Sequence, residues 1–361
     1  MSKKTQPYKK LLLPFSLIYG IIIGFRNWLF DVKIIKSKSY FTPIINVGNI
    51  AIGGTGKTPH IEYLIKSLQP NYRLATLSRG YKRKTSGFII SSSNHSYEDI
   101  GDEPKQLKYQ FPSVIVCVDE KRQRGIENIE TLESSPEIIL LDDAFQHRYV
   151  KPGLNILLTD YFHPYWKDYL LPMGNLRDSK AQADRADIVI VSKTPKSISP
   201  IKKRIIKKEL NLFPYQNLFF TTIKYGKLVK LGHTKKINID NNFSVLMLTG
   251  IAKSKHLKTH LNISFKEVFI SKFRDHHSYT ESDISNIINQ FNNINNPNKI
   301  IVTTLKDAVR LKDNSIFAEL SKLPIYYQAI EVGFLNEENE KEFNKLILKY
   351  VRNAKRDRKV Y

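Results

Sequence analysis

Residues 43–68 read PIINVGNIAIGGTGKTPHIEYLIKSL, and this order of residue types predicts a strand, a loop and a helix. The apolar residues from Pro43 to Gly48 indicate a short buried strand, and the helix is expected from about Pro59 to Leu68. A strand before a Gly-rich loop and a helix after it form the context that a phosphate-binding P-loop requires. The loop consists of Gly53, Gly54, Thr55, Gly56, Lys57 and Thr58.

The residue types of this loop favour a nucleoside triphosphate together with Mg²⁺. Glycines allow backbone N–H groups to surround phosphate oxygens without a Cβ atom in the way, and the helix N-terminus adds a partial positive charge. We expect Lys57 to reach the β- and γ-phosphates and the Thr58 hydroxyl to bind Mg²⁺. Ala51 stands where the usual pattern has its first glycine, so the match is a variant, and a chance match in a turn is the alternative.

A second apolar segment supports the phosphate site. Residues 138–141 are Ile-Ile-Leu-Leu, and Asp142 and Asp143 follow directly. P-loop enzymes place the carboxylate that supports Mg²⁺ at the end of such a strand. Many buried strands end in Asp, but the pairing with the Gly-rich loop upstream makes chance the weaker explanation.

Short apolar segments alternate with helical segments along the chain, which predicts an α/β fold with a parallel sheet. These segments lack polar–apolar alternation, as strands buried on both faces do. Residues 219–231 (FFTTIKYGKLVKL) do alternate and carry Tyr225-Gly226-Lys227 at their centre, so we expect a two-stranded hairpin there.

Four segments follow from this pattern. We expect a membrane-associated helix in residues 1–38 and a P-loop domain in residues 39–215. A β-hairpin linker, or β-ribbon, in residues 216–236 would join that domain to a second, smaller α/β domain. The second domain would span residues 237–361 and include a C-terminal helix and a basic tail.

Charge sets this chain of 361 residues apart, because its formal net charge is +23. Such a surface suits a polyanionic partner, namely nucleic acid, anionic lipid or a phosphorylated substrate. Both ends are basic: residues 1–40 hold eight Lys or Arg against one Asp, and residues 349–361 hold six against one. The single cysteine, Cys117, excludes an internal disulfide framework and a Cys-rich zinc site.

An uncharged apolar run from Leu11 to Phe25 adjoins the N-terminal basic residues. Its fifteen residues fall short of the roughly 20 that cross a bilayer. A helix lying on anionic lipid, with Tyr19 and Trp28 at the interface, is the favoured interpretation. A buried core helix and an export signal remain alternatives, although no small-residue cleavage site follows Phe25.

Four polar clusters carry further chemistry. They are Ser78-Arg79-Gly80-Tyr81, Gly101-Asp102-Glu103-Pro104 in an expected loop, Gly174-Asn175-Leu176-Arg177-Asp178, and Arg274-Asp275-His276-His277-Ser278-Tyr279. Each has an ordinary structural alternative, such as a helix cap, a paired surface arginine or a satisfied polar corner. Two adjacent histidines do not by themselves make a metal site.

Taken together and in order, ten segments resemble the tetraacyldisaccharide 4′-kinase family, the lipid A 4′-kinases. They are VGNIAIGGTGKTP, LSRGYKRKT, GDEP, VDEKRQRG, LLDDAFQHR, LLPMGNLRD, ADIVIVSK, LTGIAKS, FRDHHSYT and VTTLKDAVRL. The resemblance implies transfer of the γ-phosphate of ATP to the 4′-hydroxyl of a tetraacylated glucosamine disaccharide 1-phosphate. It also implies two α/β domains joined by a β-ribbon and work at the cytosolic face of the bacterial inner membrane.

The resemblance assigns roles to individual residues. Asp102 is expected to be the catalytic base and His276 to orient it from the other domain, while the choice of His276 over His277 stays open. Thr58, Glu103, Asp142 and Asp143 would hold Mg²⁺ directly or through water, with His147 nearby. Arg177 would contact the transferring phosphoryl group, because a guanidinium presents a planar fork to phosphate oxygens. Substrate contacts are expected from Arg79, Arg122, Arg124 and Asn175.

Two rival functions remain at this stage. A P-loop NTPase acting on nucleic acid would use the +23 charge, and a non-catalytic nucleotide-gated scaffold would bind nucleotide without phosphorylating lipid. The GDEP and DHH clusters favour the kinase over both. We therefore expect ATP and Mg²⁺ as cofactors, the lipid disaccharide and an anionic membrane surface as partners, no nucleic acid, and a monomer.

Overall fold

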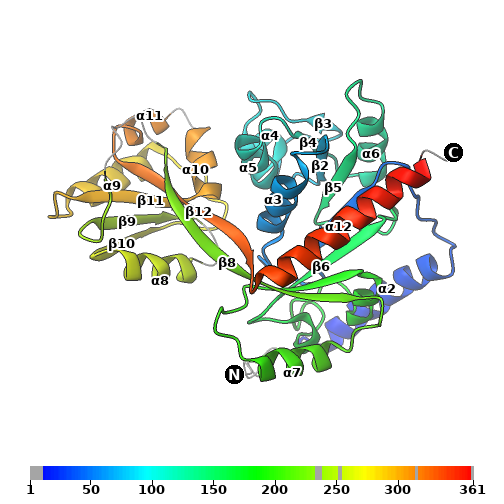
Figure 1. Cartoon of the computed structure of the whole chain (residues 1–361). Helices are drawn as coiled ribbons and strands as arrows, with labels where there is room; N and C mark the ends of the chain where they lie inside the picture. The colour runs from blue at the N-terminus through cyan, green and yellow to red at the C-terminus, as the bar shows by residue number, and fades with distance from the viewer. Residues whose placement is uncertain (1–10, 232–237, 251–253, 314–315, 359–361) are drawn as a thin grey trace.

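Twelve strands form one sheet in the part of the chain that the computed structural model describes, which is residues 11–231, 238–250, 254–313 and 316–358 (Figure 1). Their order across the sheet is β10-β9-β11-β12-β8-β7-β6-β1-β5-β2-β4-β3. The strands are β1 (Ile44–Gly48), β2 (Leu74–Ser78), β3 (Ile89–Ile90), β4 (Ile115–Val118), β5 (Ile138–Asp142), β6 (Leu154–Asp160), β7 (Ile188–Ser192), β8 (Asn217–Lys230), β9 (Ser244–Thr249), β10 (Glu267–Lys272), β11 (Lys299–Thr304) and β12 (Ile325–Phe334).

Helices cover the sheet and fall into two lobes (Figure 1). The first lobe contains β1 to β7 with α2 (Leu13–Asp31), α3 (Lys57–Leu68), α4 (Tyr97–Ile100), α5 (Asp102–Gln110), α6 (Arg122–Glu130), α7 (Pro200–Leu210) and α12 (Glu337–Arg358). The second lobe contains β9 to β11 with α8 (Lys255–Ser264), α9 (Glu281–Asn292), α10 (Leu305–Lys312) and α11 (Phe317–Leu320). Strands β8 and β12 run from one lobe to the other.

Some expectations concern residues outside the described ranges. They are the basic residues between Lys3 and Lys10, the linker residues 232–236, residues 251–253 of the LTGIAKS segment, and Lys359.

The parallel sheet predicted from the apolar segments is present. Every residue of β1, β5 and β7 is buried, which explains why these segments lack polar–apolar alternation. Strand β1 pairs in parallel with β5, Val47 opposite Asp142, and with β6, Gly48 opposite Leu157. The carboxyl ends of these strands therefore meet at one edge, where the Gly-rich loop begins.

The predicted hairpin at residues 219–231 is wrong. Residues 217–230 form the single strand β8, which pairs antiparallel with β12 from Thr221 opposite Phe334 to Lys230 opposite Tyr326. Gly226 continues the strand beside an irregularity between Gln328 and Ile330, and its carbonyl accepts a hydrogen bond from Gln328 Nε2 at 2.7 Å. The partner that satisfies the backbone of β8 thus comes from about a hundred residues downstream, not from a local turn.

The C-terminal helix also departs from the expected domain plan, because α12 packs on the first lobe. Phe343, Ile347 and Val351 join the core cluster that holds Ile45 and Leu64. Tyr350 adds a polar contact to the same lobe, since its hydroxyl donates to the Ile44 carbonyl at 3.1 Å. The second lobe is consequently inserted between β8 and the end of β12, and the first lobe is built from both ends of the chain.

Helix α2 has one docked face and one exposed face. On the docked face, Ser16 Oγ donates to Leu170 O at 3.0 Å and Asn27 Nδ2 donates to Asp178 Oδ1 at 2.7 Å. The opposite face presents large apolar side chains, among them Ile21 at 72 % and Ile22 at 62 % exposure. Within the described residues, α2 is the one helix long and apolar enough to cross a membrane by length and composition.

Candidate active site

The Gly-rich loop ends at the first turn of α3, which begins at Lys57 and so two residues before the predicted start. Gly56 precedes the helix with a φ of +91°, a left-handed conformation that glycine adopts without strain. Asn49 steadies the loop, because its Nδ2 donates to Thr55 Oγ1 at 2.9 Å. The backbone of residues 53–58 therefore turns around the N-terminus of α3.

His60 fixes the last carbonyl of this loop. Its Nδ1 lies 2.7 Å from Gly56 O and its Nε2 lies 3.0 Å from Thr221 Oγ1 of β8. Burial lowers the pKa of His60 to about 4, so the ring is neutral at physiological pH. A neutral ring that donates from Nδ1 to Gly56 and accepts at Nε2 from Thr221 satisfies both contacts, and it ties the loop to β8.

Asp143 contacts two cationic side chains beside the Gly-rich loop. Arg177 donates to it from Nη1 at 3.0 Å and from Nη2 at 2.7 Å, and Lys57 Nζ lies 3.6 Å from its Oδ2. Asp143 has a φ of +53°, an uncommon value for a residue other than glycine. Although burial alone would raise it, Lys57 and Arg177 bring the pKa of Asp143 down to about 2. The carboxylate therefore holds both cations beside the loop.

Asp142 differs from Asp143 because nearby groups compensate the negative charge of its carboxylate poorly. Its Oδ1 is buried and has no hydrogen-bond partner among the described residues. Burial, reinforced by the charges of Asp143 and Glu103, raises the pKa of Asp142 to about 7. A buried carboxylate oxygen without a partner is where a cation would be accommodated. Among the described residues, no three His, Cys, Asp or Glu side chains are grouped closely enough to hold a metal by themselves.

A second polar cluster lies at the N-terminus of helix α5. Asp102 and Glu103 form its first turn, not a loop as expected, and negative side chains are favourable at a helix N-terminus. Gly101 allows this approach, because a Cβ there would lie 3.1 Å from the backbone of Gly80. Asp102 is buried, with 4 % of its surface exposed.

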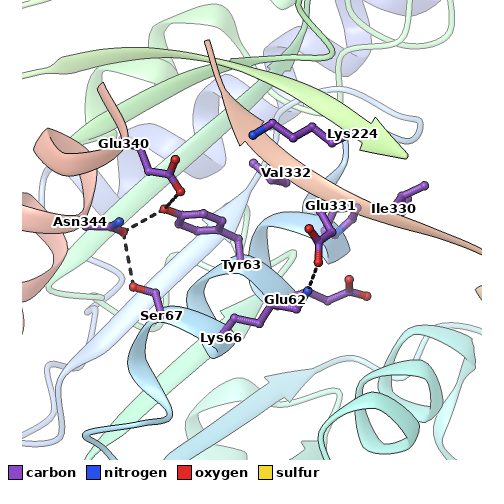
Figure 2. Close-up of a pocket in the computed structure, with 11 residues that line it drawn as sticks. Glu62, Tyr63, Lys66, Ser67, Lys224, Ile330, Glu331, Val332, Glu340 and Asn344 are labelled. Carbon is purple, nitrogen blue, oxygen red and sulfur yellow. Dashed lines mark hydrogen bonds and ion pairs between the residues drawn. The ribbon is translucent and has the colours of Figure 1, made fainter. Parts of the chain in front are cut away.

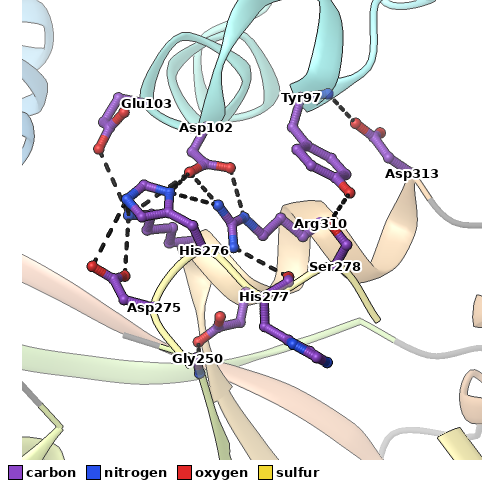
Figure 3. A network of polar contacts seen from close by, with 12 residues as sticks. Tyr97, Asp102, Glu103, Gly250, Asp275, His276, His277, Ser278, Arg310 and Asp313 are labelled. Atoms are coloured by element: carbon purple, nitrogen blue, oxygen red, sulfur yellow. Dashed lines mark hydrogen bonds and ion pairs between the residues drawn. The ribbon is translucent and has the colours of Figure 1, made fainter. Parts of the chain in front are cut away.

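Asp102 is contacted from the second lobe by His276, Lys306 and Arg310, and Figure 3 shows how His276 and Arg310 face it. His276 Nδ1 lies 2.7 Å from its Oδ2, the contact that the family resemblance implied. Arg310 of α10 donates from Nε to Oδ1 at 2.6 Å and from Nη2 to Oδ2. Lys306 Nζ lies 3.8 Å from Oδ2. Although burial alone would raise it, these partners hold the pKa of Asp102 at about 2.

The two adjacent histidines face different partners. His276 has a φ of +64°, which turns its ring toward Asp102 and places Lys306 Nζ 3.4 Å from its Nε2. Such a backbone conformation costs on the order of 1–3 kcal/mol and is typical of functional sites. His277 instead lies 2.8 Å from Asp283 Oδ2, in the cap of helix α9. His276 is therefore the member of the pair at the lobe interface.

Sequence reasoning missed Arg310 and Lys306. Both belong to the VTTLKDAVRL segment and lie four residues apart, so they share one face of α10. Lys306 Nζ also lies 3.8 Å from Glu103 Oε1 and 3.7 Å from Asp275 Oδ1. It therefore contacts carboxylates of both lobes. The two cations four residues apart, next to Asp307, are the sequence pattern that could have indicated a role for this helix. Such pairs are common on helices that face solvent, so the pattern is weak.

The remaining residues predicted to contact the substrate differ in their burial and in their hydrogen-bond partners. Arg79 is exposed near the site, whereas Arg122 is buried and donates to Asp119 O at 2.7 Å. Arg124 is occupied by Asp119, with contacts of 2.9 Å and 2.7 Å. Asn175 is exposed and donates from Nδ2 to Asp168.

His147 is the remaining residue expected near Asp143. Burial and nearby arginines lower the pKa of His147 to about 4, so its ring is neutral.

A cavity of about 380 Å³ lies behind the Gly-rich loop, between α3, the β8–β12 ribbon and α12 (Figure 2). Lys66 on α3 forms an ion pair of 2.5 Å with Glu331 on β12, and Tyr63 OH lies 3.0 Å from Glu340 Oε1 on α12. Glu62, at 4 % exposure, accepts a hydrogen bond from Gln106 Nε2 at 2.6 Å, and burial raises the pKa of Glu62 to about 7. This contact joins the helix that starts at Lys57 to the helix that starts at Asp102.

The chain matches a family model described as Tetraacyldisaccharide-1-P 4′-kinase over residues 8–352. It is 44 % identical over 360 residues to the tetraacyldisaccharide 4′-kinase of Bacteroides thetaiotaomicron, which covers 96 % of this chain and 94 % of the relative. It is 45 % identical over 354 residues to that of Phocaeicola vulgatus, covering 96 % of both chains. Its fold is similar to the crystal structure of LpxK from Aquifex aeolicus in complex with ATP, with a TM-score of 0.72, 30 % identity and coverage of 95 % of this chain and 99 % of that chain.

Proposed function

The chain belongs to the tetraacyldisaccharide-1-P 4′-kinase family, and on that premise we propose that it transfers the γ-phosphate of ATP to the 4′-hydroxyl of a tetraacylated glucosamine disaccharide 1-phosphate. The observation that carries this proposal is the 2.7 Å contact between Asp102 and His276, next to Glu103, whose charge acts on Asp142 at the end of β5. A sugar hydroxyl is a poor nucleophile at neutral pH, so a proton acceptor has to stand near the phosphate that it attacks.

Residues 53–58 act as the P-loop in this proposal. Backbone N–H groups around Gly53 to Gly56 surround the β- and γ-phosphates, and Lys57 supplies a positive charge at the same place. Asn49, which lies 3.4 Å from Lys57 Nζ through its Oδ1, positions that amine. Arg177 stabilises the transferring phosphoryl group with a guanidinium that Asp143 already orients.

Asp142 and Thr58 are the residues that would hold Mg²⁺, and Glu103 and Asp143, whose charges act on Asp142, would take part through water. The fit rests on the Asp142 Oδ1 atom, which is buried without a hydrogen-bond partner among the described residues, and on the raised pKa of that carboxyl group. When bound, Mg²⁺ neutralises charge on the phosphates and orients them.

His276, not Asp102, is the proton acceptor in this proposal, which reverses the roles expected from the sequence. A carboxylate whose pKa is about 2 takes up a proton poorly at neutral pH, and Asp102 is already engaged by Arg310 and His276. When Nδ1 of His276 donates to Asp102, the lone pair of Nε2, which Lys306 Nζ contacts at 3.4 Å in this structure, would accept the proton of the 4′-hydroxyl. Asp102 then fixes the tautomer and stabilises the imidazolium that forms.

Helix α2 is proposed to hold the enzyme at its lipid substrate. Its exposed apolar face would enter the interface of the bacterial inner membrane from the cytosolic side, where ATP is available. The docked face touches the catalytic region directly, because Tyr19 OH donates to the carbonyl of Arg177 at 2.9 Å. The membrane surface and the site would therefore lie on neighbouring parts of the first lobe. Action as a monomer, without nucleic acid, stays a prediction.

The test is incubation with ATP, Mg²⁺ and a tetraacyl disaccharide 1-phosphate in detergent micelles, followed by mass spectrometry. One added phosphate on the lipid is expected from the wild type, and none from Lys57→Ala. Lys66→Ala is the matched control, since Lys66 lies on the same helix but pairs with Glu331 on the far side from the loop. ATP hydrolysis without lipid phosphorylation in the wild type would overturn the proposal.

A further inference from the structure

Glu62 is a buried acidic residue that the proposed phosphoryl transfer does not use. It lies on α3, five residues after Lys57, and only 4 % of its surface is exposed. Figure 2 shows its carboxyl group directed away from the pair formed by Tyr63 and Glu340. Burial raises the pKa of Glu62 to about 7, so this group destabilises the folded chain at neutral pH. Buried titratable groups of this kind are typical of functional sites.

The partner of Glu62 is Gln106, which lies on α5. Glu62 Oε1 accepts a hydrogen bond from Gln106 Nε2 at 2.6 Å. Gln106 follows Asp102 by four residues, so both side chains lie on one face of α5. At a rise of 1.5 Å per residue, the two bonded residues lie about 6–8 Å along each helix from its first residue. One hydrogen bond thus joins α3 and α5 close to the N-termini that carry Lys57 and Asp102.

Helix α5 is also held by the second lobe. Arg310 of α10 contacts both oxygens of Asp102, and Lys105 Nζ lies 3.1 Å from Oδ1 of Asp313, the residue that follows α10. Lys105 and Gln106 are consecutive, so neighbouring side chains connect α5 to the second lobe and to α3. A shift of α5 relative to α3 would therefore change the distance between the Gly-rich loop and the side chains that surround Asp102.

We propose that Glu62 and Gln106 are positioning residues, whose hydrogen bond sets the distance between the Gly-rich loop and the pair formed by Asp102 and His276. The inference rests on the proposed function, because it takes the loop and that pair to act on one reaction. A displacement of about 1 Å between reacting groups can lower a rate about a hundredfold. Loss of the bond leaves every group that would contact ATP or the lipid in place, so its effect falls on kcat and not on binding.

A second hydrogen bond joins the same two segments farther from the site. Gln69 Nε2, just after the end of α3, donates at 2.5 Å to the Oγ atom of Ser113, which lies beyond the end of α5. This bond is exposed and lies at the ends of the two helices opposite to Lys57 and Asp102. Removal of Gln69 is therefore a matched control, because it breaks a link of the same chemistry without a change near the helix N-termini.

The test is steady-state kinetics of the full chain with ATP, Mg²⁺ and the lipid substrate. Glu62→Leu and Gln106→Leu should each lower kcat about tenfold, while KM for ATP and for the lipid stays within about twofold of the wild type. The double variant should lose no more than either single variant, because both changes remove one contact. Glu62→Gln, which keeps an acceptor for Gln106, should retain most of the wild-type kcat. Gln69→Ala should behave as the wild type.

Scanning calorimetry at pH 8 distinguishes positioning from a general effect on stability. Glu62→Leu removes a buried carboxyl group, and the cavity that Glu62 lines leaves room for the leucine side chain. The variant should therefore melt no lower than the wild type. A loss of turnover without a loss of stability is the result that supports a positioning role.

The outcomes separate this inference from the proposed function. Wild-type kcat in both leucine variants overturns the inference and leaves the proposed function standing, since the wild type still phosphorylates the lipid. Losses that multiply to about a hundredfold in the double variant also overturn it, because the two side chains then act independently. An equal loss in Gln69→Ala overturns it as well, because the effect is then not specific to the bond near the helix N-termini. A wild type that does not phosphorylate the lipid overturns the proposed function, on which this inference rests.

Discussion

His276 and Asp102 belong to opposite lobes, and the Nδ1 atom of the one lies 2.7 Å from the Oδ2 atom of the other. The contact exists only while the second lobe rests on helices α4 and α5, so the site is complete only in this arrangement. Arg310, which is buried, contacts both oxygens of the same carboxylate and fixes its orientation. The Asp102 carboxylate therefore takes part both in the proposed proton transfer and in the contact between the two lobes.

His276→Ala should lower kcat by at least about a hundredfold with a modest change in ATP affinity, because it removes the proposed proton acceptor. Asp102→Ala should lower kcat to a similar extent through loss of positioning. Added imidazole should restore part of the activity to His276→Ala but not to Asp102→Ala. Steady-state kinetics on the lipid substrate measures these effects.

His277→Ala is the control for this pair. Its ring contacts Asp283 in the cap of α9, so kcat should stay near the wild-type value. If His276→Ala kept wild-type turnover while Asp102→Ala lost it, Asp102 would be the base after all.

Arg310→Met should loosen the lobe interface. The substitution leaves Asp102 buried without its main cation, which costs about 3–5 kcal/mol in a closed interior, and the lobes can relieve that cost by separating. We expect faster hydrogen–deuterium exchange in α5 and α10 and a loss of kcat of at least about tenfold. Lys258→Met, on an exposed position of α8, should change neither. Wild-type exchange in Arg310→Met would show that the pair does not hold the lobes together.

Asp142→Asn should raise the Mg²⁺ concentration that gives half-maximal activity at least about tenfold, because it removes the buried anionic oxygen that faces the proposed metal. A titration of activity with Mg²⁺ at saturating ATP provides the measurement. Asp184→Asn, at an exposed position of the same lobe, is the comparison and should behave as the wild type. An unchanged Mg²⁺ requirement in Asp142→Asn speaks against this carboxylate as a ligand.

The pH dependence of stability should report on Glu62. Its pKa is about 7 in the folded chain and near 4.5 when unfolded, so the folded state retains a proton that the unfolded state releases between these values. Stability contributed by the protonated form is present below pH 4.5 and is lost as the pH rises to 7, a loss on the order of 3 kcal/mol.

Glu62→Gln removes that dependence while keeping an acceptor for Gln106. The variant should melt at the wild-type temperature at pH 5 and above it at pH 8, as measured by scanning calorimetry. Glu331→Gln, with a side chain 55 % exposed in the same cavity, should show no such difference. Equal melting temperatures for Glu62→Gln and wild type at pH 8 would mean that the buried carboxyl is not destabilising.

Charged residues on the exposed face of α2 should weaken membrane binding without unfolding the chain. Ile21→Asp and Ile22→Asp alter side chains that contact solvent, whereas deletion of residues 1–30 would also remove the contacts of Ser16 and Asn27. Sedimentation with vesicles containing anionic lipid should recover less of each variant. Ile263→Asp, at an 81 % exposed position of α8, is the control. Equal recovery of all variants would indicate that α2 packs on the first lobe and does not bind the membrane.

Features encoded in contiguous residues could be predicted from the sequence. The strand–loop–helix around Lys57 and the apolar strand before Asp142 both follow from local patterns, and parallel pairing brings their ends together. The contact between Asp102 and His276 came from the family resemblance, because nothing in the spacing of two residues 174 positions apart indicates it.

Other features depend on partners far away in the chain. The alternation in β8 indicated a strand but not that its neighbour is β12, so a hairpin was expected. The amphipathic pattern of α12 fits either lobe, and only three-dimensional packing decides that Phe343 enters the first. Arg310 looks like one more cation in a basic chain until its burial is known.

The position of α12 also bears on how the chain is made. Synthesis runs from the N-terminus, and Phe343, Ile347 and Val351 leave the ribosome after the whole second lobe, yet they fill the core that Ile45 and Leu64 begin. The second lobe draws its strands and helices from residues that precede them and can close its core first. The nascent protein therefore leaves apolar core residues of its first lobe uncovered until residues 343–351 have been made, and a chain cut short before residue 343 would expose them permanently.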